Sequence, residues 1–220
     1  MYGIQVAGVE ATISTFFDTT ESFDRDEAKQ LIRQYLREFR DVNLTPENVT
    51  LIGRDDLFRF NFKVNFFAGL GTIDLAANRI EMAFRDMKTP GDVELVSSIL
   101  TRASTLLGDK ATHANSALTV AFHAHILSGG NQASYFETLI PKVNGEQPQA
   151  IAFYRAEPDF LPEVRAAIER SNSINGGVFF NWNGMIAGAL TSKALTRMKE
   201  SIYSFLTLLN LTPADGTTLL

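Results

Sequence analysis

The sequence predicts an α+β fold in which one unit of strands and helices occurs twice. Three observations support this: stretches of alternating apolar and polar residues, stretches of apolar residues at helical spacing, and a second half that repeats the order of the first. The chain has 220 residues, of which 45% are hydrophobic and 20% are charged. This composition is typical of a globular protein with a sizeable core.

The first unit begins with a strand, because apolar and polar residues alternate from Val9 to Phe16. A helix over 25–40 follows, with Asp24 as its N-cap and Glu27 placed to complete a capping box. The remaining elements are a strand at 49–52, a strand at 57–66, a hairpin of 72–75 and 80–84 that turns at Asn78, and a helix with apolar residues from Val93 to Leu107 that ends at Gly108. The predicted order is strand, helix, four strands and helix.

A polar segment at 109–114 is expected to be a linker, and the second unit begins after it. Its elements are a strand at 118–124, a short helix around 135–140, strands at 150–154, 164–168 and 178–182, a further strand after a turn at Asn183–Gly184, and a helix from Leu195 to Leu209. We therefore predict two repeats, 1–108 and 115–220, that share one continuous antiparallel sheet. The helices of both repeats should cover one face of this sheet and leave the other face open.

This doubled element order resembles that of the TATA-box-binding protein family. The segment 157–162 (Glu-Pro-Asp-Phe-Leu-Pro) resembles the Glu-Pro-x-x-Phe-Pro segment of the family, and 178–184 resembles its apolar strand ending in a Ser-Gly turn. The resemblance implies a saddle with helices on its convex side, which binds AT-rich duplex DNA in the minor groove. It also implies a second transcription initiation factor as a partner. The expected location is the nucleus of a eukaryote, or the cytoplasm for an archaeal or viral protein.

In this family, paired phenylalanines act as wedges that open base steps. By resemblance, the wedge candidates are Phe58, Leu75, Phe160, Leu161 and Phe180. The candidates for contacts with the groove or with phosphates are Arg59, Asn61, Lys63, Asn115, Thr119, Arg165, Ala187 and Ala189. Asn115 falls where the family has a groove-contacting asparagine, and Ala187 and Ala189 are small enough for a close approach of DNA.

Other residues favour a different function. Glu10 and Glu81 fall on the expected groove face, where a carboxylate meets the negative potential of DNA. Leu75 replaces a phenylalanine, and strand alternation places Phe58 on the core side, so its wedge role would require a bulge. A core position is the alternative for every phenylalanine. Trp182 fits either an exposed anchor for a partner or a side chain folded over the sheet edge. The rival hypothesis is a protein-interaction module that kept the saddle and lost DNA binding.

Several classes of protein are disfavoured. The chain has no cysteine, which excludes disulfide frameworks and zinc fingers, and a reducing intracellular setting is expected. We find no signal peptide and no apolar run that could span a membrane. The net charge of −5 disfavours coating of nucleic acid by charge alone. His123 and His125 share one strand face but make only half a metal site. No catalytic or cofactor motif is found, so we expect neither an enzyme nor a cofactor, and a carrier of small ligands has no specific support.

Overall fold

The computed structural model describes residues 1–18, 22–53, 59–127, 132–139, 150–214, 217 and 219. Its strands are β1 (Tyr2–Phe16), β2 (Val49–Gly53), β3 (Phe60–Phe66), β4 (Gly71–Ala76), β5 (Arg79–Met87), β6 (Asn115–Ile126), β7 (Ala150–Arg155), β8 (Val164–Arg170), β9 (Val178–Ala187) and β10 (Leu211–Pro213). Its α-helices are α1 (Arg25–Glu38), α2 (Pro90–Thr105), α3 (Gln132–Leu139) and α4 (Ser192–Leu208). Short 3-10 helices are η1 (Arg40–Val42), η2 (Pro46–Asn48), η3 (Phe67–Gly69) and η4 (Gly108–His113).

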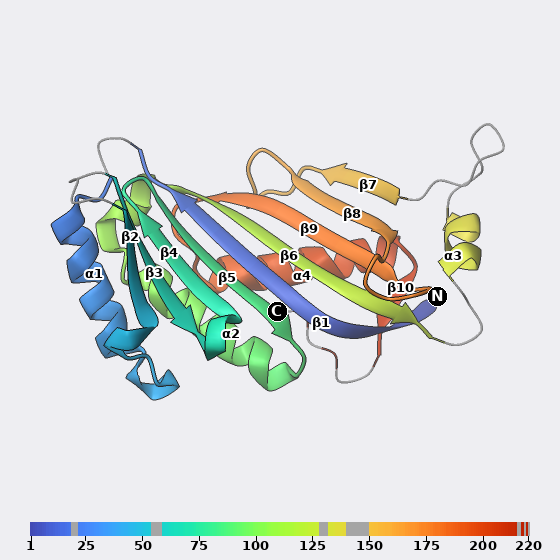
Figure 1. The fold of residues 1–220 in the computed structure, drawn as a ribbon. Coiled ribbons are helices and arrows are strands. Elements are labelled where there is room, and N and C mark those ends of the chain that lie inside the picture. The colour runs from blue at the N-terminus through green and yellow to red at the C-terminus, as the bar shows by residue number, and fades with distance from the viewer. Residues whose placement is uncertain are drawn as a thin grey trace.

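All strands join one sheet in the order β2-β3-β4-β5-β1-β6-β9-β8-β7, and β10 pairs with the start of β1 (Figure 1). The β1–β10 pair is parallel, and every other neighbouring pair is antiparallel. The two longest strands, β1 and β6, pair with each other in the middle of the sheet. The predicted α+β class with a large antiparallel sheet is confirmed.

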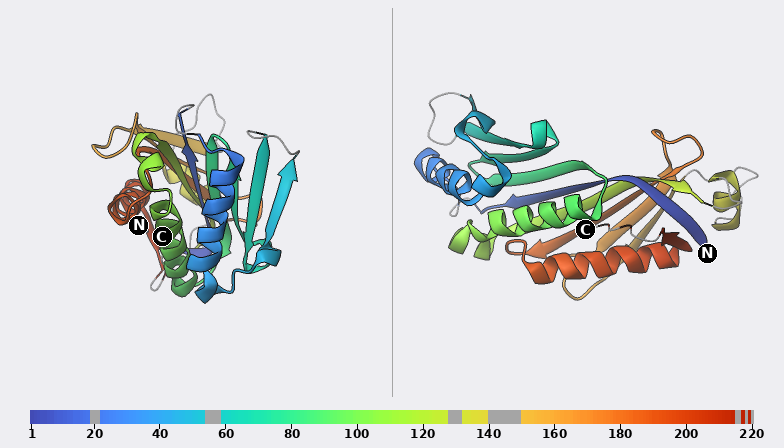
Figure 2. Two further views of the ribbon diagram at one scale, coloured as in Figure 1. Left: turned by 90° about the vertical axis from the view of Figure 1, so that its left-hand side faces the viewer. Right: turned by 90° about the horizontal axis from the view of Figure 1, so that it is seen from below.

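One face of the sheet is covered by helices. Figure 2 shows α1, α2 and α4 lying along the same face, and Figure 1 shows α3 beyond the end of the sheet, near the N-terminus. Tyr35 of α1, Ile99 of α2 and Phe205 of α4 are fully buried in the core between helices and sheet. The hydroxyl of Tyr135 in α3 donates to the carbonyl of Leu209 at a distance of 3.0 Å, which ties α3 to the end of α4.

The helices begin where their capping residues predict. Asp24 Oδ1 accepts a hydrogen bond from the Glu27 amide at 2.8 Å, and Glu27 Oε2 accepts one from the Asp24 amide at 2.9 Å. This is the capping box expected from the sequence, and it satisfies amides that the first helical turn leaves unpaired. Thr89 and Thr191 cap α2 and α4 in the same way, each accepting from an amide three residues further on.

The predicted turn at Asn183–Gly184 is wrong, because both residues lie inside the continuous strand β9. Asn183 pairs with a residue on each neighbouring strand. Gly184 faces the helices, where a Cβ would lie 2.7 Å from the Trp182 ring and 2.9 Å from the Phe160 ring. The glycine therefore makes room for two aromatic rings. In the described residues, three strands lie between α3 and α4, and the predicted fourth strand is the second half of β9.

The segment expected to be a linker, 109–114, is largely the 3-10 helix η4. Ala111 in this segment is buried, with 4% of its surface exposed. Together with the twelve residue pairs that join β1 to β6, this packing makes the two halves parts of one body. The sequence alone predicted a polar connection because only two small apolar side chains in this segment, Ala111 and Ala114, reach the core.

Candidate functional site

The open face of the sheet is the side that lies away from α1, α2 and α4. Its side chains alternate along each strand with those of the core, and they are half-buried or exposed except for the small Ala121. The open face consists of Glu10, Thr12 and Ser14 on β1; Asn61, Lys63 and Asn65 on β3; Thr72 and Asp74 on β4; Glu81 and Ala83 on β5; Ala117, Thr119, Ala121 and His123 on β6; Ala152 and Tyr154 on β7; Arg165, Ala167 and Glu169 on β8; and Phe179, Asn181, Asn183 and Met185 on β9.

Strand register arranges these side chains in rows across the sheet. One row runs through Tyr154, Arg165, Asn183, Thr119, Thr12, Ala83, Thr72 and Asn65. The middle of the face, where β1 meets β6, carries small side chains such as Ser14 opposite Ala117 and Thr12 opposite Thr119. A partner can therefore approach the backbone of the two central strands closely.

The first half of the open face, on β1 and β3–β5, contains facing carboxylates. Glu81 lies directly opposite Asp74, which lies opposite Lys63. Ser14 donates to Glu81 at 3.0 Å, and Arg79 forms an ion pair with Glu81 at 3.8 Å. Partial burial raises the pKa of Asp74, and Glu81 raises it further, while Lys63 acts in the opposite direction. This half therefore opposes an anionic ligand and suits a cationic one.

The second half, on β6–β9, is built mainly from amides, hydroxyls and small side chains. Asn183 Nδ2 donates to Thr119 Oγ1 at 2.8 Å, and Arg165 follows in the same row. His123 shares a hydrogen bond of 2.8 Å with the Ser171 hydroxyl, and its ring packs on Phe179 with the ring centres 4.7 Å apart. Donors and acceptors thus lie along this half with one carboxylate, Glu169, at its margin.

Two amide oxygens add hydrogen-bonding capacity to the open face. Asn61 Oδ1 and Asn181 Oδ1 are shielded from solvent and have no hydrogen-bond partner among the described residues. A shielded acceptor without a donor is unfavourable unless a ligand or water supplies one. Within the same described residues, no group of three or more metal-ligating side chains comes together.

Three of the wedge candidates are core residues, which corrects the sequence prediction. Leu75 and Phe180 are fully buried on the helix side, because they share the strand parity of the other core residues of β4 and β9. Phe160 is 3% exposed and packs edge-on against Trp182, with their ring centres 5.3 Å apart. None of these three side chains is available to DNA on the open face. Leu161 is 52% exposed, and Phe58 lies outside the described residues.

The groove and phosphate candidates are placed more favourably. Four of them lie on the open face: Asn61, Lys63, Thr119 and Arg165. Asn115 and Ala187 pair with each other where β6 begins and β9 ends, and both are exposed. Arg59 is exposed next to the start of β3, whereas Ala189 packs partly against the core. Their contacts with DNA stay predictions.

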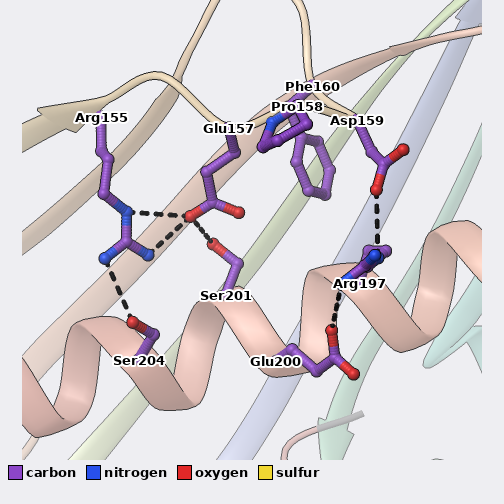
Figure 3. Close-up of a pocket in the computed structure, with 9 residues that line it drawn as sticks. All are labelled: Arg155, Glu157, Pro158, Asp159, Phe160, Arg197, Glu200, Ser201 and Ser204. Carbon is purple, nitrogen blue, oxygen red and sulfur yellow. Dashed lines mark hydrogen bonds and ion pairs between the residues drawn. The ribbon is translucent and has the colours of Figure 1, made fainter.

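The segment 157–162 fastens the loop between β7 and β8 to α4 (Figure 3). Glu157 Oε1 accepts hydrogen bonds from Arg155 Nε at 3.0 Å, from Arg155 Nη2 at 2.6 Å and from the Ser201 hydroxyl at 2.8 Å. Ser201 in turn accepts from Trp182 Nε1 at 3.0 Å. Trp182 is fully buried, so neither of the two roles weighed for it is correct.

A cavity of about 380 Å³ lies beside this segment, between the loop and α4 (Figure 3). Each of its charged groups is ion-paired: Arg155 pairs with Glu157, Arg197 pairs with Asp159 and Glu200 at 3.0 Å each, and Lys193 also pairs with Asp159 at 3.7 Å. The cavity therefore offers a ligand no uncompensated group of either sign. We assign these residues to stability.

Sequence reasoning missed several residues of the open face, namely Asp74, Phe179, Asn181, Asn183 and Met185. The signal was present, because residues from Val178 onward alternate without interruption to Ala187. Interpreting Asn-Gly as a turn ended the predicted strand at residue 182 and left Asn183 and Met185 outside it.

No protein-family model matches this chain, and no curated protein gives a significant match. Among the helices that the structure describes, none is both long and apolar enough to cross a bilayer.

Proposed function

We propose that this chain is a binding protein with a saddle made of two related halves, 1–108 and 115–220, as in the TATA-box-binding family. The mirrored sheet order supports a duplication: β5, β4 and β3 follow β1 on one side, and β9, β8 and β7 follow β6 on the other. In each half a helix follows the first strand: α1 follows β1, and α3 follows β6. A threonine-capped helix then follows a run of strands: α2 follows β5, and α4 follows β9.

The open face is the proposed binding surface. It extends over eight strands, none of the described helices covers it, and its centre is lined by small side chains. Such a face is suited to recognition.

The proposed ligand is a protein that presents basic side chains to the first half. The observation that carries this choice is the burial of Leu75, Phe160 and Phe180, which removes the wedges needed to bend DNA. Asp74 and Glu81 act in the same direction, because they would face phosphates or the negative minor groove.

Duplex DNA is the second candidate, and it is favoured by the second half alone. Arg165, Asn183 and Thr119 form a row of groups that could contact a groove or a phosphate, and Leu161 is exposed nearby on the loop before β8. Under this proposal the chain would bind AT-rich DNA without paired wedges and would recruit a second transcription initiation factor.

A pair of substitutions tests the open face as a binding surface. Thr119→Arg places a long cation in the shallow centre, and Thr207→Arg makes the same change at an exposed position of α4. Proteins cross-linked to the wild-type chain in a lysate of its source should be retained by Thr207→Arg and lost by Thr119→Arg. Hydrogen exchange with a purified partner should protect β1, β6 and β9. Equal retention by both folded variants would contradict the proposal.

The DNA candidate is tested by fluorescence anisotropy with AT-rich and GC-rich duplexes at two salt concentrations. The leading proposal predicts no AT-selective binding at micromolar protein. AT-selective binding that weakens in both Leu161→Ala and Arg165→Ala would instead establish the second candidate. The slope with salt would then be small, because few basic side chains face the open surface.

A further inference from the structure

A second, unrelated feature lies at the end of the sheet, where the β3–β4 turn meets the first turns of α2. We call it the end pocket, and it is formed by Phe67, Leu70, Phe84, Arg85, Leu95 and Val96. Its volume is about 370 Å³, within the range of small-molecule sites. Phe84 and Val96 form a buried floor, whereas Phe67, Leu70 and Leu95 are 38%, 49% and 39% exposed.

The backbone beside the end pocket is strained. Phe67 and Ala68 are consecutive non-glycine residues with φ angles of 49° and 54°, in the left-handed region that glycine or asparagine normally occupies. Gly69 follows with a φ of 94°. A turn alone would be better served by small or polar residues, so the aromatic side chain at position 67 requires another explanation. Strain of this kind is a feature of ligand sites.

Four charged residues, Arg85, Asp86, Lys88 and Asp92, also line the end pocket, and they differ in whether their charge is paired. Asp86 is paired with Lys88 at 3.0 Å. Asp92 accepts hydrogen bonds from the amides of Lys88 at 3.0 Å and Thr89 at 2.8 Å, so its carboxylate is used to cap α2. Arg85 is exposed, and no described carboxylate forms an ion pair with it. Its amide donates to the Leu70 carbonyl at 2.9 Å, which holds it next to the apolar wall.

We propose that the end pocket binds an amphiphilic anion whose hydrocarbon part packs against Phe67, Leu70 and Leu95 and whose anionic head pairs with Arg85. The apolar lining residues supply hydrophobic surface, and Arg85 is the charged lining residue that forms no ion pair with a described carboxylate. An alkyl carboxylate matches both the apolar surface and the charge. The end pocket does not include any residue of the open face, so this site is independent of the proposed function.

Isothermal titration calorimetry with two detergents of equal chain length tests the proposal. Dodecanoate and dodecyltrimethylammonium, each below its micellar concentration, differ in the sign of the head group. Dodecanoate should bind saturably with one site, and the cation should bind at least about tenfold more weakly, which is the effect of losing one charged hydrogen bond. Equal binding of the two probes, or no saturable binding of dodecanoate, would overturn the proposal.

Variants locate the site. Arg85→Gln should weaken dodecanoate binding about tenfold or more and leave the weak binding of the cation unchanged. Phe67→Gly should abolish binding while preserving the fold, since glycine accepts the backbone conformation at position 67 without strain. Leu208→Ala, at a residue of α4 that is 56% exposed, is the control and should bind like the wild type. Unchanged binding in Arg85→Gln would contradict the assigned head-group contact.

Discussion

The two halves of the open face differ in chemistry although they lie on the same kind of backbone. On the first half, Asp74 and Glu81 face each other between Lys63 and Arg79. On the second half, Asn183 and Thr119 are hydrogen-bonded to each other. Both sets alternate with core residues in the same way, so the difference lies in side-chain choice alone. A ligand that spans the sheet would thus meet a charged half and a neutral half.

The covered face beneath the two halves is more alike. In each half a glycine makes room for aromatic rings: a Cβ on Gly71 would lie 2.6 Å from the Phe84 ring, and one on Gly184 would lie 2.7 Å from the Trp182 ring. Packing against helices demands similar apolar volume on both sides. The open face carries no such demand, which leaves its two halves free to differ.

The largest change in stability is expected at Phe180, where it distinguishes a core residue from a DNA wedge in the second half. Phe180→Ala should lower the free energy of unfolding by about 3–5 kcal/mol, because the side chain is fully buried and stacks on Phe122 with ring centres 5.0 Å apart. Leu161→Ala, at an exposed site, should change it by less than about 0.5 kcal/mol. Urea denaturation followed by circular dichroism measures both. Similar small effects for the two variants would show that Phe180 is not a core residue.

An intermediate effect is expected from the polar contacts of each half. Glu157→Ala removes the acceptor for Arg155 and Ser201 and should cost about 1–2 kcal/mol, because the buried Ser201 hydroxyl loses its acceptor while the Arg155 side chain, which is 38% exposed, can be hydrated. Ser14→Ala removes one bond to Glu81 on the first half and should cost about 0.5 kcal/mol. The comparison uses the same denaturation assay. A larger loss of unfolding free energy in Ser14→Ala than in Glu157→Ala would contradict this prediction.

The smallest effect concerns the charged half and depends on pH. Burial raises the pKa of Asp74, so folding favours its protonated form. Its favourable contribution is complete below the ordinary aspartate pKa of about 4 and is lost as the pH rises through the raised value. Asp74→Asn should therefore gain stability relative to the wild type between pH 3 and pH 7, by up to about 1 kcal/mol because the site is partly hydrated. A relative loss over this range would mean that Lys63 dominates the environment of Asp74.

Local sequence patterns were sufficient to predict the elements whose cause is local. Alternation specified the strands, the capping box of Asp24 and Glu27 specified the start of α1, and Asn78 specified the hairpin between β4 and β5. The same alternation placed Glu10, Lys63 and Thr119 on one face, because the period of a strand assigns each side chain to a side.

Tertiary structure decided the features that depend on residues distant in sequence. Gly184 was predicted as a turn residue because Asn-Gly favours turns locally, but the rings of Trp182 and Phe160 require a glycine there within a strand. The burial of Phe180 and Leu75 depends on which face the helices cover, and only the packing of α1, α2 and α4 fixes that choice. Strand register places Asp74 opposite Glu81. The β3–β4 turn and α2 come together beside Arg85 to form the end pocket. Local sequence encodes neither arrangement.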